Sequence, residues 1–393
     1  MHILVVPSWY KSPQTPVYGS FFEEQARALQ LLGHEVRVLY PVLLPFKFTK
    51  KTNSVTQIND DGLLTFNIYW SPYQPRIRKL SYYLFSKFVA EWFEGYIKQF
   101  GKPDVIHAHC VFYAGIAAQY LAQKYNIPLV VSEHNTDFIT EKNGNAIVHK
   151  TELRTAKKVL ENAQKSLVVS SRFAADLTQK LKLEPHVLGV MPNMVKDDFL
   201  NIPILDLPPK TESFTFLSIS FIYWRKNIQL LIDAFSQIHS QIPSAKLVIG
   251  GEGEDLASLK DYVAQLGLSH KIAFLGYLDR AQVVVQMQQC QVYAFTSFYE
   301  SFGVVLIEAL AAGKPLISTN SAGPQDIVTP QNGILVPDFE VETFANAMLE
   351  MYQNYDKYDP VALRNDAKNR FSANTIMLKT LDIYTEIVKN NTK

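Results

Sequence analysis

Short apolar runs alternate with longer amphipathic stretches through most of the chain. An apolar run at 2–6 precedes a stretch with helical spacing at 21–32 and a second apolar run at 36–39. Strands buried on both faces of a sheet read as continuous apolar runs, so this order predicts a strand–helix–strand unit of a parallel sheet. Further strands are predicted at 104–109, 128–132, 166–169, 187–191, 214–220, 246–249, 272–275, 315–319 and 334–336. The pattern therefore predicts an α/β protein.

The alternation restarts at residue 214, after a segment with the composition of a linker. Residues 201–213 contain prolines at 203, 208 and 209, and segments of this kind commonly join domains. A chain of 393 residues is also too long for one ordinary core. We therefore expect a first domain over 1–200 and a second over 201–372, followed by a last helix within 373–393.

Composition narrows the classes of partner and compartment. The chain has 38 Lys and Arg against 37 Asp and Glu, so no overall field favours nucleic acid. Its two cysteines, Cys110 and Cys290, are too few for a disulfide framework and fit a reducing compartment. The chain opens with a predicted strand rather than a signal sequence, and no apolar window of about 18 residues could span a bilayer. These features predict a cytoplasmic protein of enzyme size.

One acidic residue interrupts an otherwise apolar predicted helix. Glu308 lies within 304–312, whose other residues are all apolar. A carboxylate in a buried helix is costly unless it is hydrogen-bonded. Its partner could be a basic residue elsewhere in the protein or the hydroxyls of a ligand. Its position favours the ligand, because it lies less than two turns from the helix start that follows Gly303.

The start of this helix offers a second feature that suits a ligand. Free backbone N–H groups and the positive end of the helix dipole favour a phosphate there. A diphosphate at the helix start and a ribose diol on Glu308 would account for both features. Glu300, in the preceding turn, can face the same cavity from its rim. The alternative is that Glu300 caps the helix and Glu308 forms a salt bridge in the core.

Glu300 and Glu308, with Ser301-Phe302-Gly303 between them, resemble the E-x7-E signature of family-4 retaining glycosyltransferases. The match extends to Gly-Lys-Pro at 313–315 and Ala-Gly-Pro at 322–324. The resemblance implies the α/β GT-B fold: two facing Rossmann-like domains with parallel sheets, and a C-terminal helix (373–393) that crosses back to the N-terminal domain. It also implies that the second domain binds a nucleotide-sugar donor and the first an acceptor.

The resemblance assigns roles around this motif. It places Glu308 on the nucleotide ribose, Glu300 on the sugar hydroxyls, and the amides of Gly303 and Val304 on the sugar and diphosphate, with Phe302 in the same binding turn. It also brings two other segments to the nucleotide: Gly251 and Gly253, in a turn that could equally be a simple tight turn, and Tyr277, in the loop that holds the base.

The loop at 221–226 matches the family only in part. Lys226 stands where family members carry a lysine that neutralises the leaving diphosphate, although a solvated loop lysine is the alternative. Phe221 falls where the family has an arginine, and Asn227 replaces a glycine. Arg225, next to Lys226, is a candidate substitute for the missing arginine.

In the first half, Gly19 is the single glycine of the first loop. A nicotinamide or flavin site would need G-x-G-x-x-G there, so we reject that reading. By resemblance, Gly19 lies close to the donor diphosphate and the acceptor; the alternative is a glycine that merely opens the helix.

Three histidines follow or end predicted strands at one sheet edge. His107 and His109 point to the same side of their strand, but no third ligand at a recognisable spacing supports zinc, and a structural role is favoured. His134 follows the next strand. The resemblance places it beside the donor sugar, in contact with a sugar hydroxyl; the alternative is a structural histidine at a strand end.

Residues 76–100 form a predicted helix that is rich in aromatic residues and has a basic start. This combination could dock on an anionic membrane that holds a lipid-linked acceptor. The alternative, which we favour, is a core-facing helix with a solvated basic end.

The expected activity is transfer of a glycosyl group from a UDP-, GDP- or ADP-sugar to a hydroxyl, with retention of configuration and without a further cofactor. No D-x-D motif occurs, so metal-independent chemistry is expected, in cell-surface polysaccharide or lipid-linked glycan synthesis. An epimerase or phosphorylase on the same fold, or a non-catalytic nucleotide-sugar-binding subunit, remain the alternatives.

Overall fold

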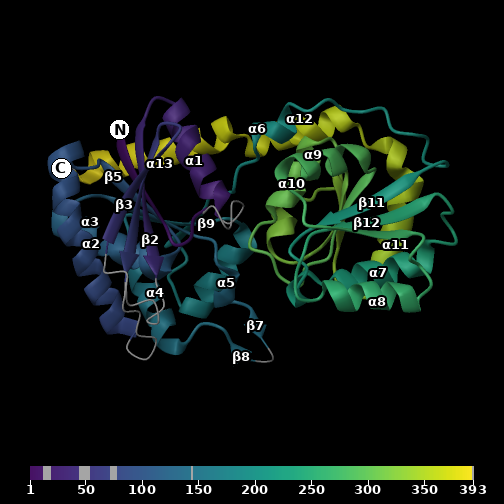
Figure 1. The fold of residues 1–393 in the computed structure, drawn as a ribbon, viewed down its shortest axis with the longest axis horizontal. Helices are drawn as coiled ribbons and strands as arrows, with labels where there is room; N and C mark the ends of the chain where they lie inside the picture. Colours follow the sequence, from purple (N-terminus) through teal and green to yellow (C-terminus); the bar gives the residue numbers. More distant parts are fainter. Residues whose placement is uncertain (12–18, 44–53, 71–77, 143–144, 392–393) are drawn as a thin grey trace. The chain divides into compact units, whose positions relative to one another are not determined.

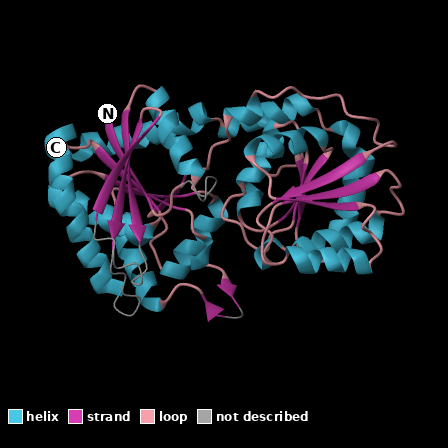
Figure 2. Cartoon of the chain, in the orientation of Figure 1, coloured by secondary structure: helices cyan, strands magenta, loops and turns pink. Residues whose placement is uncertain are grey.

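The computed structural model describes residues 1–11, 19–43, 54–70, 78–142 and 145–391. The chain divides into two compact units, the first formed by 1–169, 174–191 and 376–393, the second by 170–173 and 192–375 (Figure 1). Each unit contains a β-sheet with helices packed around it (Figure 2).

The first unit is built on an eight-stranded sheet in the order β10-β9-β6-β5-β1-β2-β4-β3. Its strands are β1 (His2–Pro7), β2 (Glu35–Leu43), β3 (Ser54–Asp60), β4 (Leu63–Trp70), β5 (Val105–His109), β6 (Leu129–Glu133), β9 (Lys165–Val168) and β10 (Leu188–Val190). Neighbouring strands are parallel except for β3, which pairs antiparallel with β4 at one edge. The central strand β1 carries Val5 between Val38 of β2 and His107 of β5.

The β3–β4 hairpin was absent from the sequence-based prediction. Its turn consists of Asp61 and Gly62, whose φ angles are 45° and 83°. An Asp-Gly pair favours such left-handed turns because glycine has no Cβ and aspartate tolerates positive φ. The Asn59 side chain also accepts a hydrogen bond from the Gly62 N–H at 3.1 Å. The signal for the hairpin was therefore present in the sequence.

The helices of the first unit agree closely with the predicted pattern. They are α1 (Ser20–Leu31), α2 (Arg78–Phe100), α3 (Ile116–Tyr125), α4 (Lys150–Asn162), α5 (Ser171–Leu181) and α13 (Ala373–Asn391). The first residues of α5 and of α13 belong to the second unit. Helix α3 begins only at Ile116, because Phe112 and Tyr113 have non-helical backbone angles within a π-type turn at Val111–Gly115. A short 3-10 turn (Thr136–Phe138) and a small hairpin, β7 (Glu141–Lys142) and β8 (Asn145–Ala146), follow β6.

Helix α2 has one buried face and one partly exposed apolar face. Phe85, Val89 and Phe93 are fully buried, as expected for a core-facing helix. On the other side, the exposed fractions of Leu80, Tyr83 and Leu84 are 48%, 48% and 43%. The basic start of the predicted helix, at 76–79, lies outside the residues whose side chains are described.

The second unit has a six-stranded parallel sheet in the order β13-β12-β11-β14-β15-β16. Its strands are β11 (Phe214–Ile219), β12 (Ala245–Gly250), β13 (Ile272–Gly276), β14 (Val292–Phe295), β15 (Leu316–Thr319) and β16 (Gly333–Val336). Its helices are α6 (Asp197–Leu200), α7 (Ile228–Ile238), α8 (Leu256–Gln265), α9 (Arg280–Gln289), α10 (Val304–Ala311), α11 (Val341–Asn354) and α12 (Pro360–Phe371), with 3-10 turns at Trp224–Lys226, Gly323–Asp326 and Tyr355–Lys357.

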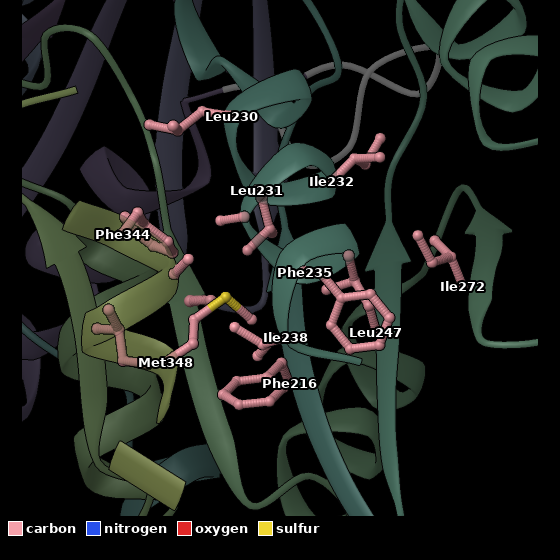
Figure 3. Close-up of a cluster of buried hydrophobic side chains, with 14 of the residues drawn as sticks. Phe216, Leu230, Leu231, Ile232, Phe235, Ile238, Leu247, Ile272, Phe344 and Met348 are labelled. Carbon is pink, nitrogen blue, oxygen red and sulfur yellow. The ribbon is translucent and has the colours of Figure 1, made fainter. Parts of the chain in front are cut away.

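The core of the second unit lies between its sheet and helices α7 and α11 (Figure 3). Phe216 of β11 and Leu247 of β12 are fully buried there against Phe235 of α7 and Met348 of α11. Burying each side chain of this size contributes about 1.5–3 kcal/mol. This core fixes the strands whose carboxyl ends carry the site described below.

Residues 192–200 differ from the predicted division of the chain. The prediction placed them in the first domain, but they pack in the second unit. Val195 forms a bridge with Ser372, and Phe199 of α6 is fully buried. Burial of Val195 and Phe199, rather than the proline-rich composition of 201–213, sets where the second unit begins.

Among the helices of the described residues, none combines the length and apolar character needed to cross a membrane.

Three histidines meet at the carboxyl ends of β5 and β6. His107 Nδ1 lies 2.5 Å from the hydroxyl of Tyr384 on α13, and its Nε2 lies 2.8 Å from Ser132 Oγ. His109 Nδ1 lies 3.2 Å from His134 Nε2. His107 thus ties the C-terminal helix to the sheet, which supports a structural role for it. No group of three or more His, Cys, Asp and Glu in the described part of the chain is arranged to hold a metal ion.

Burial keeps all three rings neutral near pH 7. It lowers the pKa of His107 and of His134 to about 3. It also lowers the pKa of His109 well below its usual value, with smaller contributions from its two histidine neighbours.

We therefore expect the folded protein to lose stability as the pH falls below about 6.5. The unfolded chain binds protons at these histidines below that pH, whereas the folded chain excludes them until far lower, so acid favours unfolding. Each such histidine costs about 1.4 kcal/mol per pH unit. Urea unfolding of the wild type and His107→Asn, at about pH 7.5 and pH 5.5, should show a smaller pH dependence in the variant. His270→Asn, at an exposed position, is the control, and an unchanged pH dependence in His107→Asn would contradict the assignment.

Candidate active site

The predicted donor-binding residues gather at one edge of the second unit. They occupy the segments that follow β11 (Arg225 and Lys226), β12 (Gly251 and Gly253), β13 (Tyr277) and β14 (Glu300, Phe302, Gly303, Val304 and Glu308). These four strands are adjacent and parallel, so their carboxyl ends lie together, where ligands bind in open α/β sheets. The fold therefore brings together residues that are up to 83 positions apart in the chain, from Arg225 to Glu308.

Lys226 and Glu300 form an ion pair at this edge. Lys226 Nζ lies 2.5 Å from Glu300 Oε2, and the exposed fractions of the two side chains are 16% and 20%. The lysine loop is fastened to the segment after β14, since the Phe298 N–H donates to the Arg225 carbonyl at 2.9 Å and Thr296 Oγ1 donates to the Lys226 carbonyl at 3.0 Å. Lys226 is thus held against Glu300 and is not a freely solvated loop lysine.

The turn from Glu300 to Gly303 packs directly on the Ala-Gly-Pro segment. The Glu300 N–H donates to the Ser321 carbonyl at 2.7 Å, and the Gly323 N–H donates to the Glu300 carbonyl at 2.8 Å. A Cβ on Gly323 would lie 2.3 Å from the Cα of Phe302, so only glycine fits. This contact explains why the two motifs occur together.

Gly303 and Phe302 set the start of α10. Gly303 has a φ of 103°, a conformation that other residues rarely adopt, and the helix begins at Val304. The Phe302 ring is buried and lies 5.8 Å from the Phe371 ring. Phe302 could therefore contact a ligand in this turn only through its main chain.

Glu308 has a basic partner in the folded chain. Its carboxylate is buried, and Oε1 lies 3.0 Å from Nη1 of Arg280 on α9. This is the partner that the sequence analysis placed second to a ligand; the role of Glu308 toward a ribose stays a prediction. Sequence reasoning missed Arg280. The sequence feature that could have identified Arg280 is a cation at the first residue of a helix, where the helix dipole disfavours positive charge.

Close packing explains why the two positions after β12 are glycines. A Cβ on Gly251 would lie 1.8 Å from the Ser220 carbonyl oxygen, and one on Gly253 would lie 1.9 Å from that of Ile222. The Ile222 N–H also donates to the Glu252 carbonyl at 2.8 Å. The glycine turn therefore supports the loop that carries Arg225 and Lys226, whether or not it also lies near a nucleotide.

The remaining residues of this edge are more exposed. Tyr277 follows Gly276 and has an exposed fraction of 49%, and Phe221, at the position of the family arginine, is 66% exposed. Arg225 Nε donates to the Tyr223 hydroxyl at 3.2 Å, and its guanidinium lies 5.3 Å from the centre of the Tyr223 ring. Tyr223 therefore fixes the direction of Arg225, and substitution for the family arginine remains a prediction.

In the first unit, His134 is oriented by a buried carboxylate that sequence reasoning did not single out. Glu133 Oε1 accepts hydrogen bonds from the His134 and Asn135 N–H groups at 2.8 Å each, and Oε2 accepts one from Val111 at 2.9 Å. Burial raises the pKa of Glu133, and these hydrogen bonds oppose that rise. An acidic residue at the end of an apolar strand was the available signal.

The start of α1 approaches the same histidine. Gly19 opens α1 with a φ of 74°, and a Cβ there would lie 2.9 Å from the Trp9 carbonyl oxygen, so this position requires glycine for close packing. The rings of Phe21 and Phe22, which follow it, lie 5.5 and 5.3 Å from the His134 ring. The structure thus brings Gly19 and His134 into one neighbourhood of the first unit.

Comparison with solved structures supports the fold. The chain resembles sucrose-phosphate synthase from Thermosynechococcus elongatus with a TM-score of 0.75, 21% identity, and coverage of 99% of this chain and 100% of the other. It resembles Anabaena Alr3699/HepE, solved in complex with UDP, with a TM-score of 0.74, 19% identity, and coverage of 98% and 100%. The predicted GT-B fold class is confirmed.

Sequence comparison supports the family. D-inositol 3-phosphate glycosyltransferase of Jonesia denitrificans is 26% identical over 356 residues, which is 83% of this chain and 80% of that protein. Glycogen synthase of Mycobacterium tuberculosis is 25% identical over 294 residues, 72% and 69% of the two chains. The family model "Glycosyltransferase Family 4" matches residues 19–199, and "Glycosyl transferases group 1" matches residues 206–370. The chain belongs to the group 1 glycosyltransferases.

Proposed function

We propose that this protein is a retaining glycosyltransferase that moves a sugar from a nucleoside diphosphate sugar to a hydroxyl of an acceptor. The observation that carries the proposal is the meeting of Lys226, Glu300 and the start of α10 at one sheet edge, with Glu308 in the second turn of that helix. This set offers a cation and free amides for a diphosphate, and carboxylates for sugar and ribose hydroxyls. Solved structures of related fold are described as complexes with UDP and with UDP-glucose, which supports a nucleotide-sugar donor.

Each residue then has a defined role. Lys226 and the amides of Gly303 and Val304 offset the charge that develops on the leaving diphosphate, and Arg225 adds a second cation on the same loop. Glu300 accepts hydrogen bonds from the donor sugar and keeps Lys226 in place. Glu308 binds the ribose. Tyr277 and the turn of Gly251 and Gly253 lie near the nucleoside, and His134 and Gly19 lie near the transferred sugar.

The proposed reaction needs no metal and no glycosyl-enzyme intermediate. The acceptor oxygen bonds to the anomeric carbon on the face from which the diphosphate leaves, the bond from that carbon to the β-phosphate oxygen breaks, and the acceptor proton passes to the leaving phosphate. Configuration is retained because attack and departure share one face. Lys226 and the helix start supply the positive charge that a metal ion bound at a D-x-D motif would supply.

The donor is a UDP-, GDP- or ADP-sugar, and no further cofactor is proposed. The acceptor is a glycan or lipid-linked sugar of cell-surface polysaccharide synthesis, and the protein works in the cytoplasm, at the inner face of the membrane. The names of the relatives refer to different molecules, glycogen for one and D-inositol 3-phosphate for another, so the acceptor is not carried over from either.

The donor can be identified by the slow hydrolysis that glycosyltransferases catalyse without an acceptor. We expect one sugar nucleotide from a panel of UDP-, GDP- and ADP-sugars to be hydrolysed in the presence of EDTA. Loss of the ribose contact in Glu308→Ala should lower kcat/KM by roughly 10- to 100-fold, the size expected for hydrogen bonds to a charged group. Released nucleoside diphosphate is the readout.

The control is Glu350→Ala, which removes an exposed glutamate near the C-terminal end of α11. Product formed from the donor alone, with the nucleotide still attached, would indicate an epimerase, and consumption of orthophosphate a phosphorylase. Tight donor binding without turnover, with or without acceptor, would indicate a binding subunit. Failure of every donor to bind or react would overturn the proposal.

We also propose that the exposed face of α2 rests on an anionic membrane. Leu80, Tyr83 and Leu84 are about half exposed, and the sequence from 62 to 90 contains no acidic residue but has Arg76, Arg78, Lys79 and Lys87. Exposed apolar side chains on a segment with a basic sequence match an anionic lipid surface. Contact there would bring the enzyme to a lipid-linked acceptor.

Vesicle sedimentation tests this membrane contact. The wild type should sediment with vesicles of phosphatidylglycerol and phosphatidylcholine, and less so at high salt, because charge attraction is screened. Leu80→Ser with Leu84→Ser should reduce the bound fraction several-fold. Leu378→Ser, at a leucine of α13 that is 47% exposed, should leave it unchanged. Equal binding of the double variant and the wild type would refute the contact.

A further inference from the structure

Arg280 stands at the first residue of α9 on a backbone that is tightly fixed. Asp279 caps this helix: its Oδ1 accepts the Gln282 N–H at 2.9 Å, and its own N–H donates to Gln282 Oε1 at 2.9 Å. A cation at this position opposes the positive end of the helix dipole. The stability of α9 therefore does not explain why an arginine is placed here.

The guanidinium of Arg280 is held by groups from two other helices. Nη1 lies 3.0 Å from Glu308 Oε1 on α10, and the group lies 4.5 Å from the centre of the buried Phe199 ring on α6. Nε lies 3.8 Å from Asp198 Oδ2. These contacts hold the planar group in one orientation, which a flexible lysine could not reproduce.

This arrangement leaves hydrogen-bonding capacity unused beside Glu308. Arg280 Nε and Nη2 are buried and have no hydrogen-bond partner among the described residues. Buried donors without a partner are uncommon and point to a missing acceptor. A carboxylate has about four lone-pair positions, so an ion pair with Arg280 does not by itself prevent Glu308 from accepting a hydroxyl group.

We propose that Arg280 is a positioning residue that holds the Glu308 carboxylate in the orientation that binds the ribose diol of the donor nucleotide. The inference rests on the proposed function and deepens it. Arg280 compensates the buried charge when no donor is present, and the same contact fixes the direction of the carboxylate when the diol arrives. The two partners considered for Glu308, a basic residue and a ligand, then act together on one side chain.

The test compares the affinity of the protein for nucleotides with and without a ribose diol. UDP, GDP and ADP are each compared with their 2′,3′-dideoxy analogues by isothermal titration calorimetry, and the nucleotide that binds most tightly is carried forward. The wild type should bind the ribonucleotide roughly 10- to 100-fold more tightly than the dideoxy form, as expected for charge-assisted hydrogen bonds. We call the Kd of the dideoxy form divided by the Kd of the ribonucleotide the diol ratio. In Glu308→Gln and in Arg280→Ala, this ratio should fall below about threefold.

Two further variants separate positioning from simple stabilisation. Arg280→Lys keeps the charge and should recover the melting temperature, but should not recover the ratio, because lysine lacks the planar geometry. Arg364→Ala removes an arginine whose Nε donates to the Ala311 carbonyl at 2.8 Å, at the other end of α10. It should change the melting temperature and leave the ratio at the wild-type value.

The outcomes distinguish this inference from the proposed function. An unchanged or increased ratio in Arg280→Ala, together with a reduced ratio in Glu308→Gln, would overturn the positioning role and leave the glycosyltransferase proposal standing. Full recovery of the ratio by Arg280→Lys would also overturn it, since charge alone would then suffice. Failure of the wild type to bind UDP, GDP and ADP would overturn both.

Discussion

A buried carboxylate on an apolar helix is the constraint around which this sheet edge of the second unit is arranged. Glu308 cannot stay ionised in α10 without compensation, and Arg280 reaches it from α9. A second ion pair, Lys226 with Glu300, lies at the same sheet edge. Each pair is neutral by itself, and Arg225 on the loop of Lys226 adds a further positive charge at this edge. A bound diphosphate would add negative charge, which the start of α10 is suited to offset.

Close backbone packing makes this edge rigid. Gly251 and Gly253 let the loop of Lys226 rest on the turn after β12, and Gly323 lets the Ala-Gly-Pro segment rest on the turn of Glu300 and Phe302. At each contact, a Cβ would collide with main-chain atoms. Sites that hold charged groups in fixed positions gain from such support, and these glycines provide it to the loop of Lys226 and the turn of Glu300.

The first unit offers a different kind of chemistry. Its histidines are buried and neutral, with lowered pKa values, and Glu133 accepts hydrogen bonds from the main chain at His134. Neutral imidazole rings donate hydrogen bonds to hydroxyl groups and accept them without bringing charge. The second unit supplies ionised side chains and a helix dipole.

The sequence by itself determined the order and type of most elements, because their periodicity is local, and it located Lys226, Glu300 and Glu308 by their motifs. It did not determine which side chains meet. Arg280 lies 28 positions before Glu308, and their pairing depends on how α9 and α10 pack beside one sheet. Residues 192–200 likewise join the second unit because Phe199 is buried there. Ion pairs and burial of this kind arise between distant segments, so only the tertiary structure decides them.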